Sequence, residues 1–201
     1  MRSFFILLLC LWNVDSSAEA LSKFRQFLAQ SGSGSATFEQ TVIDKSARIT
    51  QKASGTFVYS RPGKFRWAYD KPKQLIVGDG ARIWIYDEDL NQVTVRKIDQ
   101  AISATPAALL AGGAVADNLF DMKEQGIQDG LEWLEARPKK ADTSFERIRI
   151  GFSGDQLAAM ELYDQFGSHT VLRFIDLKRN PRVDASLFKF TPPKGADVVG
   201  E

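Results

Sequence analysis

Apolar residues recur at every second position through most of this chain, and this alternation constrains its fold more than any other feature. Phe65, Trp67 and Tyr69 fall on one face of the segment 64–70, between Lys64, Arg66, Ala68 and Asp70. The segment 147–152 repeats the pattern, with apolar residues at every second position. A period of two places alternate side chains on opposite faces of a β-strand. The pattern therefore predicts strands with one apolar, aromatic-rich face.

Turn signals divide these strands into hairpins. Gly78-Asp79-Gly80 separates the apolar segments 75–77 and 83–86, and Asp129-Gly130 separates two later ones. Glycine in such turns adopts positive φ at little cost. We count about ten or eleven strands, the last containing Phe188 and Phe190 and ending at Thr191-Pro192-Pro193, where proline interrupts the ladder. Short connections predict a mainly β (α+β) chain, with an incomplete antiparallel barrel rather than a parallel doubly wound sheet.

Three short segments have helical character. Residues 21–30 place apolar side chains at helical spacing, and a third short piece spans Asp184 to Leu187. Between them, Thr105 is a suitable N-cap and Pro106 suits the first helical position. Residues 107–111 contain no polar side chain, and their bulk comes from Leu109 and Leu110. A helix that is apolar on all sides must be buried, so this one is expected to plug or cover the sheet.

The N-terminus reads as a signal peptide, so we expect two regions: residues 1–20, which are removed, and a single domain of residues 21–201. Arg2 precedes a short apolar run, and small residues stand where cleavage after Ala18 or Ala20 would occur. Cys10, the only cysteine, lies within the removed segment, and Leu9 before it disfavours lipidation. Removing Arg2, Asp15 and Glu19 from 26 basic and 25 acidic residues leaves a net charge of +2, which suggests neither nucleic acid nor an acidic substrate.

The sequence offers little for catalysis, and we expect no enzyme, no cofactor and no metal site. A hydrolase needs a nucleophile with a base, and a metal needs several ligands at workable spacing. The only histidine, His169, stands in a predicted strand, where a solvent-facing position is the simpler interpretation. The acidic residues 87–89 fall in a turn and need no further role.

The aromatic face of the predicted sheet has two interpretations. Its side chains either form a solid core or line a pocket that the few helical segments leave unfilled. Pattern alone favours the core, because aromatic stripes at strand spacing are usually packed. The residues concerned are Phe38, Phe57, Phe65, Trp67, Met122 and Met160.

Several blocks resemble the family of outer-membrane lipoprotein carriers, LolA. Their order and spacing carry the resemblance, which covers nearly the whole chain after residue 20. The blocks are Phe38-Glu39-Gln40, Gly55-Thr56-Phe57, the segment Ser60 to Trp67, Ile76 to Gly80, Trp84 to Asp87, Gln92-Val93, Thr105-Pro106 and Phe188 to Gly195. The resemblance implies an incomplete barrel lidded by helices over an apolar cavity for the acyl chains of lipoproteins.

The family also implies partners and residue roles. The expected partners are acylated lipoproteins as cargo, the inner-membrane ABC transporter LolCDE and the outer-membrane receptor LolB, with a periplasmic monomer as the default. Arg61 matches the arginine that holds the lid closed through lid backbone groups, and the lid here is the segment Thr105, Pro106, Leu109 and Leu110. Ile76 and Trp84 are also expected to line the cavity. A sensor module of the same fold without a transport role is the alternative function.

Overall fold

The computed structural model describes residues 19–98, 106–111, 116–140 and 143–200. The helices are α1 (Glu19–Gln30), α3 (Pro106–Ala111) and α4 (Ala116–Leu119), and a 3-10 turn, η2, spans Ala185–Phe188. The strands are β1 (Ser33–Ile43), β2 (Ile49–Ser60), β3 (Lys64–Tyr69), β4 (Gln74–Asp79), β5 (Arg82–Asp87), β6 (Gln92–Lys97), β7 (Phe120–Gln128), β8 (Leu131–Pro138), β9 (Arg147–Ser153), β10 (Gln156–Tyr163), β11 (His169–Arg179) and β12 (Asp197–Gly200).

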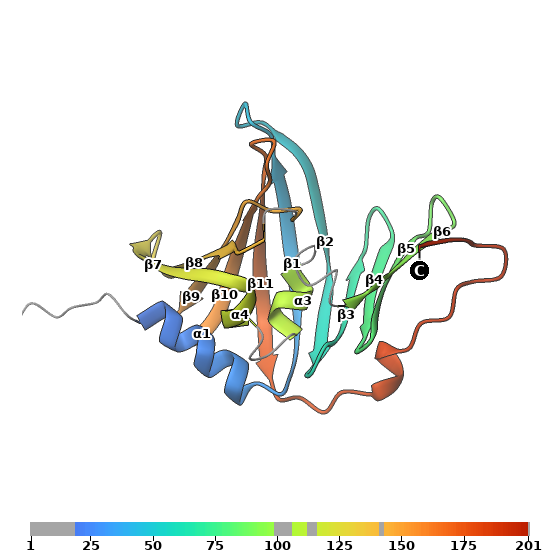
Figure 1. Cartoon of the computed structure of the whole chain (residues 1–201), viewed down its shortest axis with the longest axis horizontal. Helices are drawn as coiled ribbons and strands as arrows, with labels where there is room; N and C mark the ends of the chain where they lie inside the picture. The colour runs from blue at the N-terminus through green and yellow to red at the C-terminus, as the bar shows by residue number, and fades with distance from the viewer. Residues whose placement is uncertain (1–18, 99–105, 112–115, 141–142, 201) are drawn as a thin grey trace, which may run out of the picture.

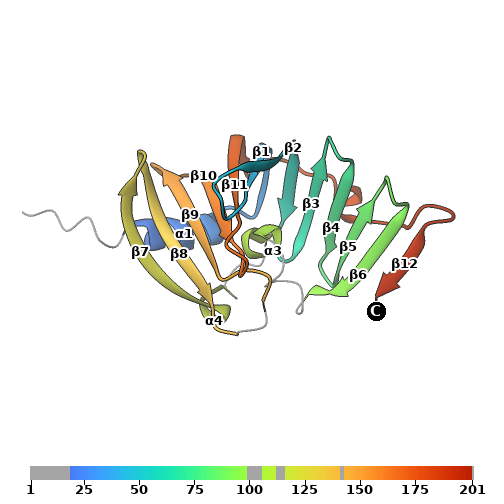
Figure 2. The same ribbon diagram turned by 90° about the horizontal axis from the view of Figure 1, so that it is seen from above.

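All twelve strands belong to one sheet, in the order β12-β6-β5-β4-β3-β2-β1-β11-β10-β9-β8-β7. Neighbouring strands are antiparallel, except that β12 runs parallel to β6. The sheet curls around α3, but its two edge strands, β7 and β12, lie at opposite ends of the arc (Figures 1 and 2). The predicted incomplete antiparallel barrel is confirmed.

The strand count differs from the prediction at the C-terminus. Phe188 ends η2 and Phe190 follows it outside any strand, so the expected last strand is wrong. Beyond the two prolines, a turn closed by Ala196 N–H donating to Pro193 O at 3.1 Å redirects the chain. Asn91 Nδ2 then donates to Gly195 O at 2.9 Å, which holds the turn beside β6. The ladder therefore resumes as β12, a four-residue edge strand that the sequence reading missed.

The helices cover the inner face of the curl. α1 begins two residues before the predicted start and packs against β7, β8 and β9. Lys23 Nζ donates to both carboxylate oxygens of Glu132 at 2.6 and 2.7 Å, and Leu21 N–H donates to Glu124 at 2.8 Å. These contacts fix α1 across one half of the sheet. Within the described residues, no helix is both long and apolar enough to span a bilayer.

Three glycines on the inner face leave room for aromatic rings of neighbouring strands. A Cβ on Gly78 would lie 2.4 Å from the Phe65 ring, and one on Gly34 would lie 2.3 Å from the Tyr59 ring. A Cβ on Gly55 would meet both the Phe38 ring and the backbone of β3. The register pairs each glycine with the strand that carries its ring, so the rings lie flat over the missing side chains. Large rings can thus cover a tightly curved sheet.

We predict that Gly78→Ala destabilises the protein, because the added methyl group overlaps Phe65 and approaches Gly63 O at 3.0 Å. Overpacking of this kind costs about 1–3 kcal/mol of unfolding free energy. Denaturant unfolding followed by circular dichroism measures it. Gly32→Ala is the matched control, because its nearest neighbour would be 3.8 Å away. Equal stability of the two variants would contradict the packing described here.

Candidate functional site

Most of the residues expected to line a cavity meet on the inner face of the sheet. Phe38, Phe57, Phe65, Trp67 and Met160 are buried in one cluster, and Ile76 and Met122 are half-buried against it. The Trp67 ring lies 4.6 Å from that of Phe38 and 4.7 Å from that of Phe57. The structure thus brings these side chains together as a continuous apolar surface, contributed by both halves of the sheet.

Trp84 does not belong with them. Its register partners in the sheet are Val77 and Val95, whereas the inner cluster contains its neighbours Ile83 and Ile85. Trp84 therefore points to the outer face, where its ring lies 5.8 Å from that of Phe190 and its Nε1 donates to Asp79 at 2.9 Å. The expected cavity role of Trp84 is wrong. Both faces of β5 are apolar, because the C-terminal segment covers the outer one.

The predicted apolar helix corresponds to α3, which lies inside the curl and packs against β3 (Figure 2). It begins at Pro106, and Thr105 falls outside the described residues. Leu109, Leu110 and Ala111 are fully buried in the inner cluster. A helix of six residues is far too short to be stable alone. Its position therefore depends on burial of these side chains and on contacts from neighbouring strands.

The turn after β2 supplies those contacts through Arg61 and Gly63. Arg61 Nη2 donates to Leu110 O at 2.7 Å, and Gly63 N–H donates to Ala111 O at 3.0 Å. The two acceptors are carbonyls at the C-terminal end of α3, which have no partners within the helix. The guanidinium carbon also lies 4.6 Å from the centre of the Tyr59 ring and 5.0 Å from that of Phe27. Arg61 thus joins α1, β2 and α3.

Burying the charged guanidinium of Arg61 costs free energy. Burial lowers the pKa of Arg61 below its ordinary value, and the neighbouring Tyr59 hydroxyl only partly offsets the effect. Nε and Nη1 of Arg61 are buried and find no hydrogen-bond partner within the described residues. A hydrogen bond to a charged group contributes about 1.5–3 kcal/mol, and unpaired buried donors cost a comparable amount. The net attachment of α3 through Arg61 is consequently modest.

A polar group that the sequence reading missed lies on the same face. Tyr69 Oη donates to Gln40 Oε1 at 2.9 Å, although β2 separates their two strands. The bond crosses β2 at the level of Gly55, the register partner of Tyr69. Burial raises the pKa of Tyr69 to about 12, partly countered by the nearby Trp67. The alternation of polar and apolar residues gave no signal here, because tyrosine and tryptophan count as apolar in the pattern.

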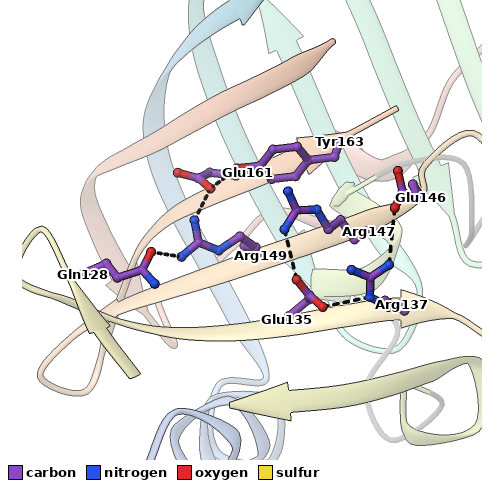
Figure 3. Close-up of polar contacts among 8 residues, drawn as sticks. All are labelled: Gln128, Glu135, Arg137, Glu146, Arg147, Arg149, Glu161 and Tyr163. Atoms are coloured by element: carbon purple, nitrogen blue, oxygen red, sulfur yellow. Dashed lines mark hydrogen bonds and ion pairs between the residues drawn. The ribbon is translucent and has the colours of Figure 1, made fainter. Parts of the chain in front are cut away.

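The outer face of β8, β9 and β10 carries a network of charged side chains, unlike the apolar inner face (Figure 3). Arg147 and Arg137 both pair with the buried carboxylate of Glu135, at 3.1 and 2.8 Å, and Arg149 pairs with Glu161 at 2.7 Å. Burial alone would raise the pKa of Glu135, but its hydrogen bonds and ion pairs with Arg137 and Arg147 lower that pKa below its ordinary value. His169 stacks on Tyr163 with ring centres 5.2 Å apart. Within the described ranges, no group of three histidine, cysteine or acidic residues could hold a metal.

Fold and site together define a class of protein: an open, curled antiparallel sheet whose apolar inner face is covered by short helices. Comparison with known proteins identifies the family. The family described as outer membrane lipoprotein carrier protein LolA matches residues 29–191. The chain therefore belongs to the LolA family.

Two relatives agree with this assignment, and a solved structure shares the fold. The outer-membrane lipoprotein carrier protein of Dechloromonas aromatica (strain RCB) is 50% identical over 185 residues, covering 92% of this chain and 89% of its own. That of Nitrosomonas europaea is 47% identical and covers 98% of both chains. A crystal structure of an uncharacterized conserved protein from Thermus thermophilus matches with a TM-score of 0.55 at 18% identity, covering 89% of this chain and 95% of its own, which supports the fold alone.

We predict that Tyr69 remains protonated well above the usual range of tyrosine, since burial raises its pKa to about 12. The unfolded chain releases this proton near pH ~10. The folded protein then holds more protons than the unfolded chain, so this contribution to stability falls as the pH rises from ~10 toward the folded pKa. Alkaline titration of tyrosinate absorbance, comparing the native chain with Tyr69→Phe, isolates the group. A difference signal with its midpoint near pH ~10 in the folded protein would contradict the burial of Tyr69.

Proposed function

We propose that this protein carries lipoproteins across the periplasm, shielding their acyl chains against the inner face of the sheet. The observation that supports the proposal most directly is α3, a helix whose described side chains are apolar and buried on an aromatic surface. A solid core needs no separate six-residue cover, whereas a site that opens does. Membership of the lipoprotein carrier family supports the same function. The role is that of a non-enzymatic carrier.

The free energies involved explain why the cover must compete with the cargo. Burying one methylene group contributes roughly 0.8 kcal/mol, so an acyl chain of about sixteen carbons has a gross transfer energy on the order of 12 kcal/mol. A carrier that kept all of this could not release its cargo. In our proposal the acyl chains displace α3 from the inner cluster, and the lost burial of Leu109 and Leu110 offsets part of the gain.

The proposed transport sequence has a donor and an acceptor. The inner-membrane transporter LolCDE loads the carrier, and the outer-membrane receptor LolB, with higher affinity for the cargo, accepts it. The carrier acts as a monomer after removal of residues 1–20. Arg61 acts as the latch of α3, because its bond to Leu110 O stabilises the closed, empty state and not the loaded one.

The first prediction from this proposal is release of cargo from membranes. Inner-membrane vesicles that contain the transporter and a labelled lipoprotein should yield a soluble one-to-one complex when the purified mature chain and ATP are added. Gel filtration of the supernatant measures the complex. Omitting ATP is the control. Absence of release, with a transporter that is active on another carrier, would contradict the proposal.

The second prediction concerns Arg61→Leu. Loss of the bond to α3 destabilises the closed state by about 1 kcal/mol, which shifts the balance toward the loaded state by about fivefold to tenfold. Loading should persist, and transfer of the label to LolB should fall by a similar factor. Arg82→Leu, at an exposed position of β5, is the matched control. Unchanged transfer by a folded Arg61→Leu protein would exclude the latch.

A further inference from the structure

One polar atom on the inner face lacks the partner that burial demands. Trp67 is only 2% exposed, and its Nε1, which can only donate, meets no hydrogen-bond acceptor among the residues that the structure describes. The rings of Phe38 and Phe57 flank it. Buried polar groups are nearly always paired, so an orphaned donor inside an apolar cluster calls for an explanation.

Two side chains beside Trp67 also carry polar groups on this part of the inner face. Tyr69 follows Trp67 on the same face of β3, with ring centres 6.4 Å apart. The Tyr69 hydroxyl gives its proton to Gln40 at 2.9 Å. Gln40, Tyr69 and Trp67 therefore form a neutral polar group, the seat, in the mostly apolar inner surface. Among the described residues the indole N–H meets no acceptor at hydrogen-bond distance, and its influence on the neighbouring Tyr69 hydroxyl is limited to a partial lowering of the pKa of that hydroxyl.

The seat lies on the strand that α3 covers. α3 packs against β3, the strand that carries both Trp67 and Tyr69. Displacement of α3 would therefore uncover part of β3. A ligand that replaces the helix can then offer the acceptor that the helix does not.

We propose that the seat binds the ester carbonyl of the cargo's acyl chains, with Trp67 Nε1–H as the donor. An ester carbonyl is an uncharged acceptor at the junction between the hydrocarbon and the polar end of a lipid, which matches a neutral donor that lies beside apolar rings on one side and Tyr69 on the other. No charged side chain belongs to the seat, so a phosphate or a carboxylate is a poorer match. The inference rests on the proposed carrier function and specifies which part of the lipid is recognised.

The test compares two probes that differ only in the carbonyl. One is a diacylthioglyceryl-cysteine peptide with ester-linked chains, and the other is its dialkyl ether analogue of equal chain length. Competition against a fluorescent lipid measures both affinities for the mature native chain, for Trp67→Phe and for Phe57→Leu. The last variant is the control, because it reduces an adjacent ring without removing a donor.

The native chain should bind the ester about tenfold more tightly than the ether, the effect of one hydrogen bond that satisfies a buried donor. Trp67→Phe should bind both probes alike, and Phe57→Leu should weaken both and keep the preference. Equal binding of the two probes by the native chain would overturn the inference, as would a preference that survives in Trp67→Phe. Failure of the native chain to bind either probe would instead overturn the carrier function itself.

A second measurement does not depend on the variants folding. An infrared spectrum of the native complex with a ¹³C-labelled ester should show the carbonyl stretch shifted to lower frequency relative to the same lipid in hydrocarbon solvent. An unshifted band in a saturated complex would overturn the hydrogen bond.

Discussion

An antiparallel sheet that curls without closing must have its inner face covered by something other than its own strands, and every other feature of this molecule follows from that constraint. Twelve strands leave β7 and β12 unjoined, so aromatic side chains from both halves face a space that the sheet alone does not fill. α1 covers one half and is fixed there by Lys23 and Glu132. α3 covers the middle with Leu109 and Leu110. The apolar core therefore depends on a helix too short to fold alone.

A covering helix of this kind must be held strongly enough to close the empty site and weakly enough for a ligand to displace it. Apolar burial favours closure without regard to direction, whereas the bonds from Arg61 and Gly63 to the last carbonyls of α3 select one position. The cost of burying the guanidinium, two of whose nitrogens have no partner in the described part of the chain, keeps the net gain in free energy small. Replacing Arg61 by an apolar side chain would remove the bond to Leu110 O, and apolar burial with the bond from Gly63 would then hold α3 less firmly and in a less defined position.

The sequence predicted the parts of this arrangement that depend on local chemistry. Turn residues such as Asp129-Gly130 located the hairpins, and the absence of polar residues identified α3 as a buried cover. The face of the sheet on which a side chain lies was harder to predict. Alternation shows that Trp84 and Ile85 point in opposite directions, but it does not show which of them points inward. Trp84 packs against the C-terminal segment on the outer face, which explains why an apolar side chain stands there.

β12 was missed because its pairing depends on a turn held by Asn91, a contact between residues distant in sequence. The Gln40–Tyr69 bond was missed because it joins β1 and β3 across the intervening β2, between residues distant in sequence.

The distribution of unsatisfied polar atoms separates the two faces of the sheet. On the outer face, the carboxylates of Glu135 and Glu161 are paired with arginines, so that surface needs no further partner. Among the described residues, the buried side-chain nitrogens without an acceptor belong to Arg61 and Trp67, and both touch the inner cluster that α3 covers. A protein selected only for stability would pair or remove such groups. Their position beside a displaceable helix is therefore better explained by a second state of the molecule, in which α3 has left and a ligand occupies its place.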